Sequence, residues 1–323
     1  MHVAFILNTI LILTPAQLGQ PTNPEKVTPT PTEKQSKEVI TPLPLWDKVE
    51  EGHSIYQELT ITQKPTFSIQ GLPFQTQSQL SYTMISKLTI NKRYEDGRLR
   101  IEQKILAAKL NQADNITRQM LTPAITLMPG TTYKITLNAN REVIDFEGHG
   151  NKVQINKQQL PIGQSLQLVS LLDKDGWKEL TNATFFFPDK AFFKGNKWSR
   201  KMTHNWGPLG SWSGEAHYFP AGKKQKIQRI GYFYKVKYRP PVGNLGGLAI
   251  GKANFQALQS KGYIYYDTEK RRVSAVEEYF RVRGNMAMKV LGQQSAVALE
   301  EEQSFRIRIF DKNPLKTSRT QKK

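Results

Sequence analysis

The chain has 323 residues, and its 46 Lys and Arg against 27 Asp and Glu give a formal net charge of +19. A hydrophobic content of 38% is too low for a protein with many membrane spans, and an aromatic content of 10% is too high for a disordered chain. The absence of cysteine excludes a disulfide framework, a zinc ribbon, an iron–sulfur cluster and a thiol nucleophile. We therefore expect a core stabilised by burial and hydrogen bonds, in one large domain or two small ones.

Residues 1–19 are predicted to be a signal peptide. Val3–Leu13 is a mostly apolar run, too short to span a membrane as a helix but suited to a secretory h-region, and Ala16 or Gly19 offers a small residue for cleavage. The n-region has no Lys or Arg, which makes the signal atypical, and a buried N-terminal strand is the alternative. We expect an exported protein, periplasmic or extracellular, whose mature chain has no transmembrane segment.

Residues 20–45 are predicted to be a Pro/Thr-rich disordered linker. Prolines recur through this segment and no large side chain in it could start a core, so the backbone should be extended. Residues 312–323 form a basic disordered tail at the other end. The folded part therefore lies between these two segments.

Strand patterns dominate that folded part. Residues 46–160 form the predicted first β lobe, in which apolar and polar side chains alternate with a period of two. This alternation is typical of antiparallel sheets with one buried and one wet face. The positions expected to face the core are Ile55, Gln57, Leu59, Ile61, Leu99, Ile101, Ile105, Tyr133, Ile135 and Leu137. Turn chemistry predicts hairpin turns at residues 95–97, 138–140 and 267–270.

Residues 161–187 break the strand pattern and are predicted to be a helical connector, with one or two short helices. Residues 188–311 form the predicted second β lobe, which is basic and aromatic. A weak repeat relates residues 131–150 to 261–284, since both show an aromatic-led strand, a polar turn and a second strand. The predicted fold class is mainly β, with two curved antiparallel sheets or partly open barrels, possibly a duplication, joined by the connector.

The segment Phe187–Trp198 reads FP-D-K-x-F-x-x-G-x-x-W. It resembles the mid-chain signature of a family of exported bacterial β-rich proteins of unknown function. The resemblance extends to the segments 56–60, 96–97 and 129–137, whereas Arg141 stands where that family tends to have Gly. The resemblance implies export and a two-part β architecture, and it implies no catalytic residue. From its residue type alone, Trp198 is either a packing anchor or a ligand contact.

Motifs for catalysis or cofactor binding are incomplete. Gly246–Ala253 falls one residue short of a phosphate loop, because Ala253 replaces the required hydroxyl residue and Pro240-Pro241 precedes it. Asp145 and Glu147 lie on one strand face, where a solvated pair is the simpler interpretation than an acid–base pair. The five histidines lack metal-binding spacing. We therefore predict no catalytic residue, no metal and no cofactor. If the protein is an enzyme, the remaining class is a hydrolase without a recognisable motif.

The charge is concentrated in one segment. Residues 189–239 hold twelve Lys and Arg against two acidic residues, interleaved with eleven aromatic side chains. Such a mixture is typical of surfaces that bind polyanions or sugars. Ordinary alternation, with aromatics inward and lysines outward, is the alternative. The candidate binding residues are Trp198, Trp206, Trp212, Lys223, Lys224, Lys226 and Arg229.

These observations lead to three hypotheses. The first is a non-enzymatic binding or structural module of the bacterial cell envelope that contacts an anionic envelope polysaccharide or lipid head groups; expected export disfavours nucleic acid. The second is a carrier of an amphiphilic ligand such as a lipid, enclosed by curved sheets. The third is the hydrolase. The sequence leaves the oligomeric state open.

Overall fold

The structure is a computed structural model. It describes residues 50–69, 75–148, 174–205, 210–240, 253–290 and 293–316. The predicted signal peptide and linker, most of the basic tail, Trp206 and the loop at 246–252 lie outside the described residues.

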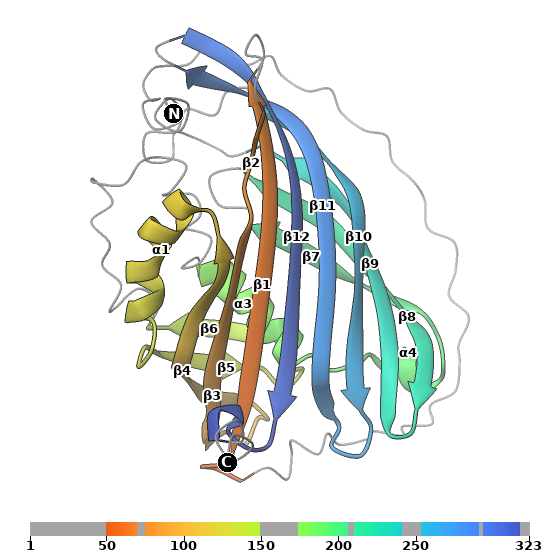
Figure 1. Cartoon of the computed structure of the whole chain (residues 1–323). Helices are drawn as coiled ribbons and strands as arrows, with labels where there is room; N and C mark the ends of the chain where they lie inside the picture. Colours follow the sequence, from red (N-terminus) through yellow and green to blue (C-terminus); the bar gives the residue numbers. More distant parts are fainter. Residues whose placement is uncertain are drawn as a thin grey trace, which may run out of the picture.

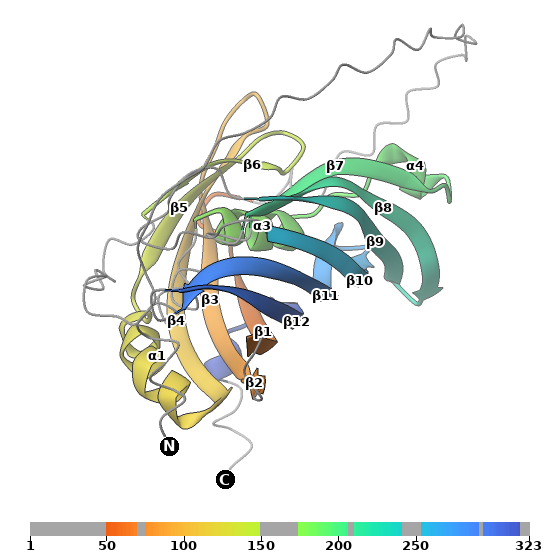
Figure 2. The same cartoon turned by 90° about the horizontal axis from the view of Figure 1, so that it is seen from above.

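The described residues form one curved, open antiparallel sheet (Figures 1 and 2). Eleven strands follow one another in the order β6-β5-β4-β3-β1-β12-β11-β10-β9-β8-β7, and β2 pairs with the end of β1. The strands are β1 (Ser54–Ile69), β2 (Gln75–Gln77), β3 (Leu80–Arg93), β4 (Leu99–Ala113), β5 (Thr132–Leu137), β6 (Val143–Glu147), β7 (Trp198–Asn205), β8 (Ser211–Lys224), β9 (Ile227–Arg239), β10 (Ala253–Asp267), β11 (Arg272–Val290) and β12 (Gln293–Phe310).

The first and last strands join the two halves of the chain. β1 pairs with β12 along a continuous register from Tyr56↔Phe310 to Ile69↔Val297. This pairing satisfies backbone groups that would otherwise lie at two open edges in the middle of the molecule. The mainly β, curved antiparallel fold is confirmed, and the two expected lobes are the two halves of a single sheet.

The core lies on the concave face of the sheet, inside the curve seen in Figure 2. The predicted alternation is confirmed in β1, β4 and β5, whose inward side chains are buried. Each fully buried Leu or Ile contributes about 1.5–3 kcal/mol from burial. Gln57 also faces inward: its Nε2 donates to Thr184 Oγ1 (2.6 Å), and its Oε1 accepts from Gln103 Nε2 (3.3 Å). These hydrogen bonds are the physical reason why an amide is tolerated there.

Three helices lie beside or within the curve: α1 (Asn115–Leu127), α3 (Lys174–Thr184) and α4 (Lys190–Phe193) (Figure 2). α3 falls within the predicted connector, and α4 falls within the mid-chain signature. α1 was not expected within the first lobe, although Leu121, Ala124, Ile125 and Met128 have helical spacing and are buried. Asp114 caps this helix by accepting from Thr117 N at 2.9 Å.

The predicted turns join strands as expected. Residues 95–97 connect β3 to β4, residues 138–140 connect β5 to β6, and residues 267–270 lie between β10 and β11. Arg141 has a φ of 68°, a conformation that favours Gly, and this explains why a Gly would suit the position. The side chain of Arg141 donates to the carbonyl of Gly97 at 3.3 Å, which links the first two turns. The two segments of the weak repeat fall on the β5–β6 and β10–β11 hairpins.

Candidate functional site

Of the predicted tryptophans, Trp198 and Trp212 lie in the described residues, and both face inward. Trp198 stacks on Tyr218, with ring centroids 5.1 Å apart, and its ring also meets Phe192 edge-on. Trp212 is 1% exposed and packs against Tyr238 and Phe280 on the concave face. Trp212 thus occupies a packing position, whereas Trp198 is only partly buried and also lines the pocket described below.

The predicted basic residues lie at the hairpin that joins β8 to β9. Lys223 and Lys224 end β8, Lys226 occupies the turn, and Arg229 lies over the ring of Tyr263 at 5.0 Å. The neighbouring hairpin is tied to this turn, since Thr268 N donates to Lys226 O at 2.9 Å. The four basic residues therefore form one group at the end of the sheet, apart from Trp212.

The convex side of β7, β8 and β9 continues this basic group along the strands. Strand register places Lys201, Glu215 and Lys235 in one row across the three strands, and the next row has Thr203, Ser213 and Lys237. We call this surface the basic edge face. Its members are Lys197, Lys201, His217, Phe219, Arg229, Phe233, Lys235, Lys237 and Arg239, with Glu215 as the carboxylate among them.

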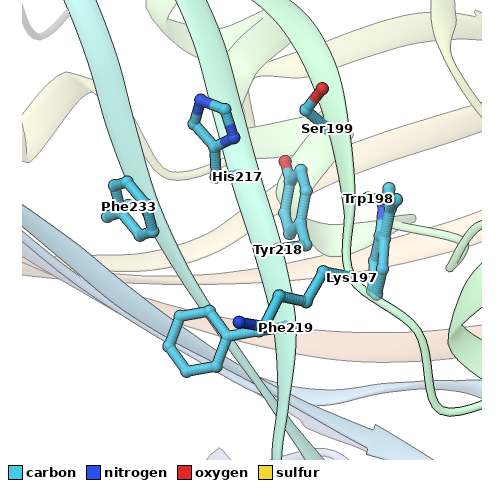
Figure 3. Close-up of a pocket in the computed structure, with 7 residues that line it drawn as sticks. All are labelled: Lys197, Trp198, Ser199, His217, Tyr218, Phe219 and Phe233. Carbon is cyan, nitrogen blue, oxygen red and sulfur yellow. The ribbon is translucent and has the colours of Figure 1, made fainter.

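An open pocket of about 500 Å³ lies midway along this region (Figure 3). It is lined by Lys197, Trp198, Ser199, His217, Tyr218, Phe219 and Phe233. Figure 3 shows that Lys197 and Phe219 both line this pocket.

A tryptophan, a tyrosine, two phenylalanines and a histidine give the pocket its aromatic character. The rings of His217 and Phe233 stack with centroids 5.2 Å apart, and those of Phe219 and Phe233 are 6.5 Å apart. Phe219 lies over Gly231, where a Cβ would come within 2.4 Å of its Cζ. Glu215 Oε2 lies 3.5 Å from His217 Nε2. The site thus combines aromatic rings, an imidazole and a lysine.

Sequence reasoning did not select Phe219, Phe233 or His217. The available signal was the strand phase: in Tyr232-Phe233-Tyr234 the two tyrosines share the inward face, so the phenylalanine between them must point outward. Phe233 is 37% exposed, which is unusual for a Phe on a sheet face that otherwise carries charge.

The centre of the convex face, on β11 and β12, differs from the basic edge face because its charges are paired. Arg308 pairs with Glu58, and Arg306 Nε lies 3.2 Å from Glu277 Oε1. Arg281 and Arg283 both pair with Glu300. Positive charge on β11 and β12 is therefore largely balanced, whereas the basic edge face carries one carboxylate among many cations. The excess charge of this half of the chain is concentrated at the sheet edge.

A separate polar cluster lies on the concave face. Tyr232 and Tyr234 both donate to Glu278 Oε2, at 2.7 and 2.5 Å. Burial raises the pKa of Glu278 above its ordinary value, and burial together with this carboxylate holds the pKa of both tyrosines well above 10. His204 Nδ1 lies 2.5 Å from Glu179 Oε2 of α3. This cluster connects the sheet to that helix.

Two further observations concern metal binding and membrane spans in the residues that the structure describes. Within them, no group of three or more His, Asp or Glu side chains is arranged to hold a metal ion. Every helix in the same ranges is too short or too polar to cross a membrane.

The fold defines a class, an open curved antiparallel sheet with helices on its concave side, and comparison with known proteins adds little to it. No family model and no curated protein matches the sequence. A protein domain from Vibrio parahaemolyticus, provisionally described as an outer membrane lipoprotein-sorting protein domain, is 9% identical to this chain. The match has a TM-score of 0.13 and covers 76% of this chain and 83% of that one. A DUF1329 family protein from Desulfovibrio piger is 10% identical with a TM-score of 0.12, over 79% and 86%. Scores this low carry no argument about fold or function.

Proposed function

We propose that this protein is a non-enzymatic binding module of the bacterial cell envelope, and that its basic edge face binds a linear anionic polysaccharide. The observation that supports this most is the local excess of cations on the outer side of β7, β8 and β9, beside a pocket lined by aromatic side chains. The predicted signal peptide supports an envelope partner over nucleic acid.

The shape of the surface favours an extended ligand. Arg229 and Arg239 are ten residues apart on β9, which corresponds to about 33 Å of strand. Lys235 and Lys237 lie between them on the same face, and Lys201 of β7 lies in the same row across the strands as Lys235. Cations distributed along such a length attract a polymer with repeated negative charges more strongly than a single small anion.

The pocket supports a sugar rather than a simple polyanion. Phe233 is exposed and the end of the Phe219 ring lies over Gly231, and both rings line the pocket together with Lys197. The apolar face of a sugar ring packs on such surfaces, while its carboxylate or sulfate pairs with a neighbouring lysine. A polymer of acidic sugars satisfies both requirements at once.

Replacing three lysines of the basic edge face tests this proposal. We expect the variant Lys201→Gln, Lys235→Gln and Lys237→Gln to bind polygalacturonate at least about tenfold more weakly than the parent protein at low salt, because three exposed ionic contacts are lost. Isothermal titration at about 50 mM NaCl measures the affinity. Neutral Gln avoids placing new carboxylates beside Glu215.

The matched control removes the same charge from the other half of the sheet. Lys87, Lys104 and Lys109 lie on the convex side of β3 and β4, so their replacement by Gln should leave the affinity unchanged. Equal losses in both triple variants would show only a net-charge effect. If phosphatidylglycerol vesicles bind to the edge face while polygalacturonate does not, the polysaccharide is the wrong partner.

The aromatic contribution is tested at Gly231. Gly231→Ala should force the ring of Phe219 off the strand, since the new Cβ would lie 2.4 Å from it, and we expect polygalacturonate binding to weaken by about threefold to tenfold. Phe219→Leu should weaken binding to a similar degree, because it removes the ring but retains apolar bulk. Unchanged affinity in both variants would remove the pocket from the proposal. Circular dichroism checks that both variants stay folded.

The amphiphile carrier is the second candidate, supported by the apolar concave face. A cluster separate from the main core gathers there, made of Ile69, Trp212, Phe255, Val282, Met286, Val297 and Leu299. Native mass spectrometry of the freshly purified protein should show a bound lipid if this candidate is correct. Repeated absence of a lipid adduct would count against it.

A further inference from the structure

Three tips at one end of the sheet carry cations that do not belong to the pocket or to its surrounding face. They are residues 223–226 at the β8–β9 hairpin, residues 267–272 at the β10–β11 hairpin and residues 311–316 after β12 (Figure 1). Because β8 to β12 are neighbours in the sheet, these tips lie side by side. We call this surface the basic tip.

Contacts between the three tips hold them together. Thr268 N donates to Lys226 O at 2.9 Å, which joins the first tip to the second. Lys270 and Arg272 both pair with Asp311, which joins the second tip to the third. The three segments therefore present their charges as one continuous surface.

The charge of the basic tip is unbalanced. Its three segments hold eight Lys and Arg against three Asp and Glu. At the same end of the sheet, the tips of the first half hold four Lys and Arg against five Asp and Glu, in residues 50–53, 91–98 and 138–142. The excess of positive charge at this end of the sheet is therefore confined to the second half of the chain.

We propose that the basic tip docks on the surface of an anionic phospholipid bilayer, with the strands of the sheet directed away from it. Lys223, Lys224 and Lys226 are exposed at the extremity of the molecule, where a flat surface reaches them together. Anionic lipids attract such clusters of Lys and Arg within about one Debye length. In this orientation the basic edge face, which follows β9 away from the tip, remains in solvent.

Two features favour a bilayer over a polymer at this surface. Leu315 is 39% exposed in the third tip, so it offers an apolar side chain to the headgroup region beside the cations. Residues 317–323 continue from this tip, and their sequence adds three further Lys and Arg and no acidic residue. The pocket that supports a sugar ligand is lined by no residue of the basic tip.

Sedimentation with vesicles tests the docking. The parent protein should bind mixed vesicles of phosphatidylglycerol and phosphatidylcholine at about 50 mM NaCl, and it should not bind phosphatidylcholine alone. The tip variant, with Lys223→Gln, Lys224→Gln and Lys226→Gln, should bind the mixed vesicles at least about tenfold more weakly, because three exposed cations leave the contact. Circular dichroism checks that this variant stays folded.

The two triple lysine variants described above are matched controls. The edge-face variant and the variant of β3 and β4 lose the same charge elsewhere, so both should bind the mixed vesicles within about twofold of the parent protein. Equal losses in all three variants would show only a net-charge effect and overturn the proposal, as would a larger loss in the edge-face variant.

Polygalacturonate binding separates this proposal from the preceding one. The tip variant should bind polygalacturonate as the parent protein does, while its vesicle binding is weakened. Weaker polygalacturonate binding with unchanged vesicle binding would assign the tip to the polysaccharide and overturn the docking. Because the two ligands are measured separately, either proposal can fail alone.

The absence of cysteine allows a direct test of the orientation. A polarity-sensitive dye attached to Gln225→Cys, a neutral position in the first tip, should shift its emission to the blue on mixed vesicles. The same dye on Gln77→Cys of β2, at the opposite end of the sheet, should not shift. No shift at residue 225, or an equal shift at both positions, would overturn the proposed contact.

Discussion

Replacing Trp212 with Ala is expected to lower the free energy of unfolding by about 4 kcal/mol. The indole is 1% exposed and meets Phe280 edge-on, with centroids 5.6 Å apart. It also packs beside Val282 and Met286 in the apolar cluster of the concave face. Truncation removes a large buried surface and leaves a cavity that neighbouring strands cannot close without breaking their register. Urea denaturation followed by circular dichroism measures the loss.

Two comparisons show whether Trp212 is a packing residue or a ligand contact. Trp212→Phe keeps a large ring and should lose about half as much stability or less. Polygalacturonate binding by this folded variant should equal that of the parent, since Trp212 lies on the face opposite to the basic edge face. Weakened binding with unchanged stability would restore Trp212 to the binding surface.

The free energy of unfolding is expected to fall by on the order of 3 kcal/mol between pH 6.5 and 9.5, because His204 loses its proton over this range. Its pKa is raised to about 9 in the folded protein from 6.5 in an unfolded chain. A raised pKa means that the folded state binds the proton more tightly, so the stabilisation is complete below pH 6.5 and disappears as pH rises through about 9. The raised pKa of Glu278 has the same sign: burial makes its carboxylate the less favourable form, so this stabilisation is lost as the pH rises through a pKa above 4.5.

Urea denaturation of the parent and of His204→Gln across this range checks the prediction. The variant should be less stable than the parent at pH 6.5, and the two curves should converge near pH 9.5, where the parent imidazole is neutral. His53→Gln is the matched control, because His53 is exposed at the start of β1 and its replacement should leave the pH dependence intact. Parallel curves for the parent and His204→Gln would contradict the assignment.

The period-two pattern predicted which residues face the core with good accuracy. Leu59, Ile101 and Ile135 point inward as expected, because alternation depends on backbone geometry alone. The three predicted turns were also found, since Asp, Asn and Gly favour the required conformations locally. Helix α1 was missed although its buried residues have helical spacing, because β-branched residues and Pro123 argue against a helix in isolation.

The candidate site was predicted only in part. The sequence located an excess of cations within residues 189–239, and the structure distributes them between a hairpin end and the convex face of three strands. Trp212 is buried on the concave face, whereas Phe233 is exposed on the convex face, and Trp198 and Phe219 both line the pocket. Which side chains face outward depends on the alternation along each strand, and a shift of one residue in the predicted strand exchanges the two faces.

The sequence by itself determined the β class, the inward and outward faces of the first strands, the turns and the segment that carries the charge, because each depends on neighbours along the chain. Only the tertiary structure decided that β1 pairs with β12, that Lys201, Glu215 and Lys235 form one row, and that Glu179 meets His204. These contacts join residues far apart in sequence, and their register is set by packing across the whole sheet, which no local pattern contains.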